Sequence, residues 1–112
     1  MKVFKILLVL LTITSNIKSY AQYEGGNGTS TSPYQIKTAN QLVYLSNTSS
    51  DWNKHFKLIA DIDMIGQTFT PIGNRANSFS GSFFGEYHTI SNLTITAPSD
   101  KLDGTGMFGV AN

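Results

Sequence analysis

The stretch Phe79–Thr96, FSGSFFGEYHTISNLTIT, decides the fold that we expect for this chain. Two strand-like pieces, Thr89-Ile90 and Leu93–Ile95, follow one another, but one simple alternation cannot place the apolar side chains of both on the same face. A corner at Ser91-Asn92 restores a common apolar face, because asparagine tolerates the left-handed backbone conformation that a sharp bend needs. A chain that runs strand, corner, strand with one apolar face is what each coil of a β-solenoid requires.

The clearest alternation lies upstream, over Phe56–Met64 (FKLIADIDM). Its even-numbered residues are apolar or small and share one face, whereas Asp61 and Asp63 lie on the other. The pattern predicts a strand with one buried face. Similar apolar centres recur at intervals in the range of solenoid repeats, at Ile36, Leu58, Phe83 and Phe108.

Two segments precede this strand. Residues 22–33 are polar and rich in Gly, Ser and Thr, which predicts a flexible polar leader. Thr38 and Gln41 have the spacing of a capping box, which predicts a short helix from about Ala39 to Asn47. We expect this helix to cover the first coil of an all-β solenoid module that occupies residues 34–112.

Residues 1–21 have the features of a secretory signal peptide. Lys2 and Lys5 precede a short apolar run, and Ser19-Tyr20-Ala21 offers small residues for cleavage before Gln22. The apolar run is about half the length that crosses a bilayer, so we expect no permanent membrane span after cleavage. The sequence therefore predicts a secreted protein, extracellular or on the cell surface.

The composition narrows the classes of partner. The chain has no cysteine, which excludes a disulfide framework, a thiolate metal site and a lipid anchor on cysteine. Beyond the predicted signal it carries five basic and seven acidic side chains, a formal net charge of −2. No basic stripe remains, so nucleic acid is not an expected partner. Abundant Thr, Ser, Asn and Gly are typical of an exported all-β protein with many turns.

A family resemblance rests on five motifs in a fixed order. They are G-x-G-T…P-Y-x-I-x-T-A-x-Q-L-x-x-L within 25–45, F-K-L-x-A-D-I-D-M at 56–64, T-P-I-G at 70–73, F-x-G-x-F-x-G-x-x-H-T-I-S-N-L-T-I at 79–95 and G-M-F-G at 106–109. This order resembles the segment that introduces GLUG-type repeats in large exported bacterial surface and adhesin-like proteins. The same segment occurs upstream of immunoglobulin-A-cleaving zinc metallopeptidases. The resemblance implies a right-handed parallel β-helix or β-solenoid, and a truncated module because the chain ends at the first G-M-F-G.

The peptidase activity does not carry over with the resemblance. Those relatives have an H-E-x-x-H zinc site, whereas here His55 is followed by Phe56 and His88 by Thr89. His88 is expected to close a turn between Gly85 and Thr89, and His55 to pack in a loop. We predict no catalytic residue, no metal ligand and no cofactor.

Five other side chains are candidates for a functional role. Asp61 and Asp63 have the chemistry of a calcium ligand pair or of acid–base carboxylates, but a solvated strand face explains them more simply. Trp52, Tyr87 and Tyr23 fall in predicted loops or at their edges, where their aromatic faces could stack on a sugar. The alternative for Trp52 is that it covers the gap between the helix and the first long strand.

These observations predict a non-catalytic secreted or cell-surface module, structural or adhesin-like, that supports downstream repeats. The expected partners are a surface glycan, a host or neighbour-cell protein, or a second copy that associates through the open C-terminal rung. The alternative is a carbohydrate-binding module of a secreted enzyme, with Trp52 and Tyr87 as its ligand-binding residues. A polysaccharide-cleaving β-helix would need charged groups along several coils, and this chain has too few coils to supply them.

Overall fold

The structure is a computed structural model that describes residues 22–96 and 106–111. The predicted signal peptide, residues 1–21, lies outside these residues. In chain order the elements are β1 (Tyr34–Ile36), α2 (Ala39–Ser46), the 3-10 turn η1 (Ser49–Asp51), β2 (His55–Leu58), β3 (Ile62–Asp63), β4 (Ser82–Phe84) and β5 (Ile90–Ser91).

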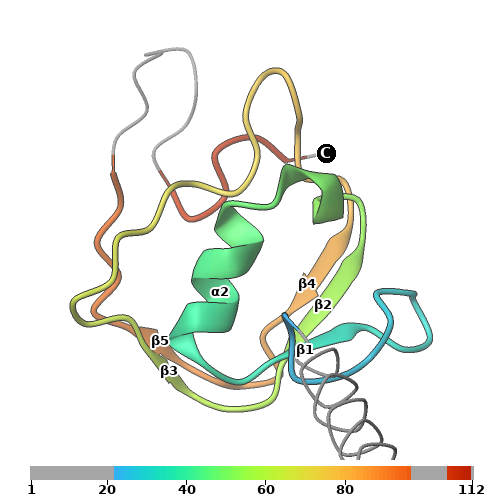
Figure 1. Ribbon diagram of the computed structural model, residues 1–112, viewed down its shortest axis with the longest axis horizontal. Helices are drawn as coiled ribbons and strands as arrows, with labels where there is room; N and C mark the ends of the chain where they lie inside the picture. Colours follow the sequence, from blue (N-terminus) through green and yellow to red (C-terminus); the bar gives the residue numbers. More distant parts are fainter. Residues whose placement is uncertain (1–21, 97–105, 112) are drawn as a thin grey trace, which may run out of the picture.

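The strands form two small parallel sheets (Figure 1). The larger sheet has the order β1-β2-β4, in which Tyr34 pairs with Phe56 and Phe56 pairs with Phe83. The smaller sheet joins β3 to β5, with Ile62 opposite Ile90. Outside these two sheets, parallel pairing consists of isolated bridges, from Phe69 to Ile95, from Ile72 to Phe108 and from Phe79 to Ala111.

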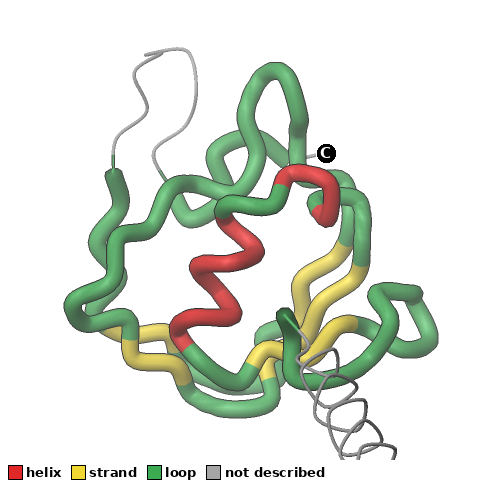
Figure 2. Tube along the Cα trace, viewed as in Figure 1, coloured by secondary structure: helices red, strands yellow, loops and turns green. Residues whose placement is uncertain are grey.

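The predicted all-β, right-handed parallel β-helix is therefore wrong. The described residues form neither a solenoid nor a closed sheet; they have strands of two to four residues, one α-helix and long stretches of loop (Figure 2). The physical reason is that the expected strand over 56–64 leaves its ladder after Leu58, so that β2 and β3 belong to different sheets. Gly66 and Gly73 adopt positive φ angles of 74° and 92°, and these turns also prevent long strands.

The helix prediction is confirmed. The Thr38 side chain accepts a hydrogen bond from Gln41 N, and Gln41 Oε1 accepts from the amides of Thr38 and Lys37. This reciprocal capping box satisfies amides that would otherwise lack partners at the start of α2. Leu42 and Leu45 are buried on the inner face of the helix, which lies in the middle of the view while the strands and loops run around it (Figure 1).

One apolar core joins the helix to both sheets. Phe56, Leu58, Ile62 and Met64 are buried, whereas Ala60 is only partly buried. The predicted burial is therefore confirmed for four of the five residues of that face, although the strand itself is interrupted. Aromatic rings continue the core across segments that are far apart in sequence. The ring centroids of Phe56 and Phe79 are 6.3 Å apart, and those of Phe79 and Phe108 are 5.0 Å apart.

Residues 22–33, which we expected to be a flexible polar leader, pack along β1 instead. Glu24 N donates to Gln35 O, and Gln35 N donates to Gly25 O, each at 2.8 Å. Tyr23 is buried in the core. A Cβ added at Gly26 would stand 1.9 Å from the carbonyl oxygen of Pro33, so glycine permits a close approach of two backbones here. The leader therefore covers the free edge of β1.

The corner at Ser91-Asn92 is also as predicted. Asn92 has a φ angle of 55°, in the left-handed region, directly after β5. Its side-chain amide donates to Asp63 Oδ1 at 2.8 Å, which holds the corner against β3. Leu93 and Ile95 beyond the corner pack against the core, so the bend returns the chain to the apolar side.

Candidate functional site

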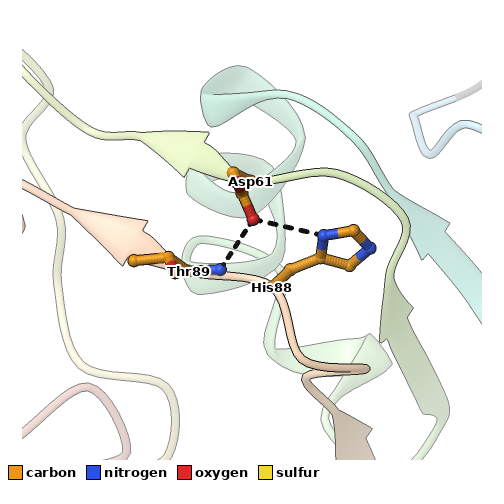
Figure 3. A network of polar contacts seen from close by, with 3 residues as sticks. All are labelled: Asp61, His88 and Thr89. Atoms are coloured by element: carbon orange, nitrogen blue, oxygen red, sulfur yellow. Dashed lines mark hydrogen bonds and ion pairs between the residues drawn. The ribbon is translucent and has the colours of Figure 1, made fainter.

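Asp61 and Asp63 act as hydrogen-bond acceptors between neighbouring segments. Asp61 Oδ1 accepts from Thr89 N at 2.9 Å and lies 3.2 Å from His88 Nδ1 (Figure 3). The register of β3 with β5 sets this geometry, because Ile62 opposite Ile90 places Asp61 beside Thr89. The backbone N–H of Thr89, and then the His88 side chain, lower the pKa of Asp61.

Asp63 has a similar arrangement at the other end of β3, as the last residue of that strand. It accepts from the Asn92 amide at 2.8 Å and from Ile65 N at 3.1 Å, and these two bonds lower its pKa in that order. Among residues 22–96 and 106–111, no group of three or more His, Asp or Glu side chains could hold a metal ion. Both carboxylates are therefore used to join segments, a role that the sequence pattern did not indicate.

Tyr87 lies at the tip of the turn that Asp61 holds. His88 N donates to Gly85 O at 2.9 Å, which closes the turn as we expected for His88. Glu86 and Tyr87 both have positive φ angles, 54° and 62°. This is the backbone of a type I′ turn, which usually contains Asn and Gly because larger side chains are strained there. The Tyr87 side chain is fully exposed, so its ring is open to a ligand.

Trp52 has a different environment from the one that sugar stacking needs. Its side chain is only 5% exposed, and its indole N–H donates to the carbonyl oxygen of Leu45 at 2.9 Å. The Trp52 carbonyl accepts from the amides of Ser80 and Gly81. The indole thus packs between the end of α2 and the sheet, which is the covering role that we weighed against ligand binding.

A contact between His55 and Ser82 was not visible in the sequence. His55 Nδ1 and Ser82 Oγ form a hydrogen bond across the β2–β4 pair, where the two residues are directly opposite. A base next to a hydroxyl is the first requirement of an activated nucleophile. In the part of the chain that the structure describes, no carboxylate contacts His55, so the third member of a triad is not assembled.

A small pocket lies where the leader meets the helix. Its volume is about 180 Å³, and the side chains that line it include Tyr23, Tyr34, Tyr44 and Asp51. Tyr23 Oη donates to Asp51 Oδ2 at 2.8 Å. Sequence reasoning missed this pocket because it treated the leader as flexible; the only signal was the presence of Tyr23 in an otherwise polar segment.

Comparison with known proteins gives two likenesses. The chain is 34% identical to a part of halomucin from Haloquadratum walsbyi, over 83% of this chain and 1% of halomucin. It is 35% identical to a part of a Gly-rich membrane protein from Evansella cellulosilytica, over 79% of this chain and 10% of that protein. The chain thus spans a small fraction of each relative. No family model and no solved structure matches it.

Within 22–96 and 106–111, no helix has both the length and the apolar character that a bilayer crossing requires.

Proposed function

We propose that this chain is a non-catalytic module of a surface or membrane-associated protein, structural or adhesin-like, that supports further repeats. The names of the two relatives, halomucin and a Gly-rich membrane protein, support the surface or membrane association. The fractions of those proteins that the chain covers, 1% and 10%, support a module within a much longer protein. The resemblance to the segment before GLUG-type repeats supports the same role.

The use of the exposed carboxylates carries the non-catalytic part of this proposal. Asp61 and Asp63 each accept two hydrogen bonds, and all four donors hold local turns or the paired segment around β5. A carboxylate with a lowered pKa is a weak general acid at neutral pH, since it has no proton to give. The residues with the strongest catalytic chemistry on this face therefore stabilise the backbone.

Surface proteolysis tests the proposed location. Intact cells that produce the chain are treated with a protease, and the released peptides are identified by mass spectrometry. We expect peptides from residues 22–96, with peptides of an abundant cytoplasmic protein absent from the same sample. Recovery of the chain only after cell lysis would contradict the proposal. A panel of polysaccharides tests the other half, because any turnover by the purified chain would identify it as an enzyme.

A second candidate function is glycan binding through Tyr87. The observation in its favour is a fully exposed aromatic ring on a turn with two strained residues, held in place by Asp61. Strained residues persist where the surrounding structure fixes them, and they often lie at binding sites. Glycan-array binding that disappears in Tyr87→Ala, but persists in a control with Phe84→Ala, would establish this function. An array with no bound glycan would refute it.

We also propose that the chain associates with a second copy of itself. β4 is the end strand of its sheet among the described residues, and Phe84 on it is 48% exposed. An end strand with an exposed aromatic side chain can pair with a second copy. We expect sedimentation velocity to show a dimer or larger species that Phe84→Lys converts to monomer. A wild-type chain that remains monomeric at all concentrations would exclude this contact.

A further inference from the structure

The pocket between the leader and α2 has no role in the proposed function. It lies at a junction of four segments, since Tyr23 belongs to the leader, Tyr34 begins β1, Tyr44 lies on α2 and Asp51 ends η1. Its volume of about 180 Å³ is below the range of roughly 300–1,000 Å³ that is usual for drug-sized ligands. A ligand here must therefore be small, or must insert only one small group.

The aromatic side chains of this pocket are arranged around Tyr23. The ring centroids of Tyr23 and Tyr34 are 4.5 Å apart with a tilt of 33°, and those of Tyr23 and Tyr44 are 5.4 Å apart and nearly perpendicular. Tyr34 and Tyr44 are partly exposed, whereas Tyr23 is buried. Ring faces carry a negative quadrupole that attracts cations, and ammonium groups are bound by aromatic cages of this kind.

The side chains of the pocket lining make it negatively charged, and the faces of the tyrosine rings are negative as well. Among the described residues that line the pocket, Asp51 is the only carboxylate and none is a lysine or an arginine. One of its oxygens, Oδ2, accepts from Tyr23, while Oδ1 has no hydrogen bond to any residue of the described chain. Burial, and then the bond to Asp51, raise the pKa of Tyr23, so this phenol keeps its proton and stays a donor. Asp51 thus retains an acceptor oxygen for a ligand.

We propose that this pocket binds the ammonium group of a small organic cation, primary or quaternary, between the faces of Tyr34 and Tyr44 and beside the Asp51 carboxylate. Anions are disfavoured because the described residues of the lining offer a carboxylate and no basic side chain. A neutral sugar would gain neither the charge attraction of Asp51 nor the cation–π attraction of the tyrosines. This site goes beyond the proposed surface function and does not depend on it.

Saturation-transfer NMR on the purified full chain tests this proposal with two probes of the same shape. One is choline, and the other is its neutral isostere, in which a carbon atom replaces the nitrogen. We expect saturable binding of choline and at least ~5-fold weaker binding of the isostere, because only the cation gains the π and carboxylate attraction. Equal affinity for the two probes would overturn the proposal, as would the absence of saturable choline binding.

Matched variants show whether the named residues are responsible. Asp51→Asn keeps an acceptor for Tyr23 but removes the charge, and should weaken choline binding ~10-fold. Tyr44→Leu should also weaken it, while Tyr44→Phe keeps the ring and should bind choline like the wild type. Ile65→Ala changes an exposed side chain outside the pocket lining and serves as the control. Unchanged choline affinity in Asp51→Asn would refute the assignment even if Tyr44→Leu failed to fold.

Discussion

Gly81 is the position where a single methyl group should disturb this fold most directly. A Cβ added there would stand 1.7 Å from the carbonyl oxygen of Lys54 and 2.7 Å from its carbonyl carbon. These are backbone atoms, which cannot rotate away as a flexible side chain can. Real Cβ atoms almost never come within 3.0 Å of another atom. To bring the added Cβ even to 3.0 Å from Lys54 O, the two segments must move apart by about 1.3 Å. Gly81→Ala must therefore separate the start of β4 from the start of β2.

The magnitude follows from the hydrogen bonds that this shift breaks. Ser82 N donates to Lys54 O at 3.2 Å, and the amides of Ser80 and Gly81 donate to Trp52 O at 2.9 and 3.1 Å. A shift of about 1.3 Å takes all three bonds beyond hydrogen-bonding distance. At about 1 kcal/mol for each bond, the free energy of unfolding should fall by about 3 kcal/mol. This is a large part of the 5–15 kcal/mol that is usual for a folded domain.

Gly85 provides the matched control. A Cβ at Gly85 would meet no atom within 4 Å, and Gly85 does not have a positive φ angle. Gly85→Ala should therefore change the free energy of unfolding by less than about 0.5 kcal/mol. Urea unfolding can be followed by the fluorescence of Trp52, the single tryptophan, whose carbonyl accepts from Gly81. If Gly81→Ala and Gly85→Ala had the same unfolding free energy, the close approach of β4 to Lys54 would be refuted.

Three further experiments test the capping, the carboxylates and the turn. Thr38→Ala removes the helix cap and should lower the unfolding free energy by about 1 kcal/mol, whereas Thr38→Ser should retain it in urea unfolding. Hydrogen bonds hold the pKa values of Asp61 and Asp63 below that of a free aspartate, so their stabilising contribution is present above the free-aspartate pKa and is lost as the pH falls through the lowered pKa values of the folded state. The melting temperature of the double variant Asp61→Asn and Asp63→Asn should therefore fall less steeply with acidification than that of the wild type. Equal pH dependence of the two melting temperatures would contradict this. Replacing both turn residues, Glu86→Asn and Tyr87→Gly, should relieve the left-handed strain and raise the unfolding free energy by about 1 kcal/mol; a lower melting temperature would contradict the strain.

Features set by a few neighbouring residues could be predicted from the sequence. The capping box of Thr38 and Gln41 gives the start of α2, and the left-handed tolerance of asparagine gives the corner at Asn92. Both depend on side-chain chemistry within three residues of the feature. The alternating burial over 56–64 was predictable for the same reason, because it depends only on which residues are apolar.

Features that depend on pairing partners could not be predicted. Ile36 lies opposite Leu58 in the structure, so the first interval between apolar centres does correspond to a strand pair. The next interval does not, because Phe83 lies opposite Phe56 and not opposite Leu58. The pairing of β3 with β5 has an interval of its own, since Ile62 lies opposite Ile90. The apolar pattern is compatible with several such registers. A regular solenoid needs one interval throughout, and no local pattern revealed that the intervals differ.

The tyrosine pocket was missed for a different reason. Composition predicted that the leader would be flexible, because glycine and short polar residues cannot bury much apolar surface. In the structure, however, Gly26 is needed for close contact with Pro33, and the leader amides pair with Gln35. Glycine permits both flexibility and close backbone approach, and only the position of the opposing segment distinguishes the two. Tyr23 and Asp51 meet as a consequence of that packing, although 28 residues separate them.

The short strands and the bonded carboxylates have one common explanation. The β3–β5 ladder contains only two residue pairs, so few backbone hydrogen bonds hold it. Asp61 extends the attachment at one end by accepting from Thr89 N, and Asp63 extends it at the other by accepting from the side chain of Asn92. Side chains thus supply bonds that a longer ladder would take from the backbone. Acidic residues that alternate beside a short strand and face Thr, His or Asn of a later segment are then better interpreted as attachment points than as catalytic or calcium-binding groups.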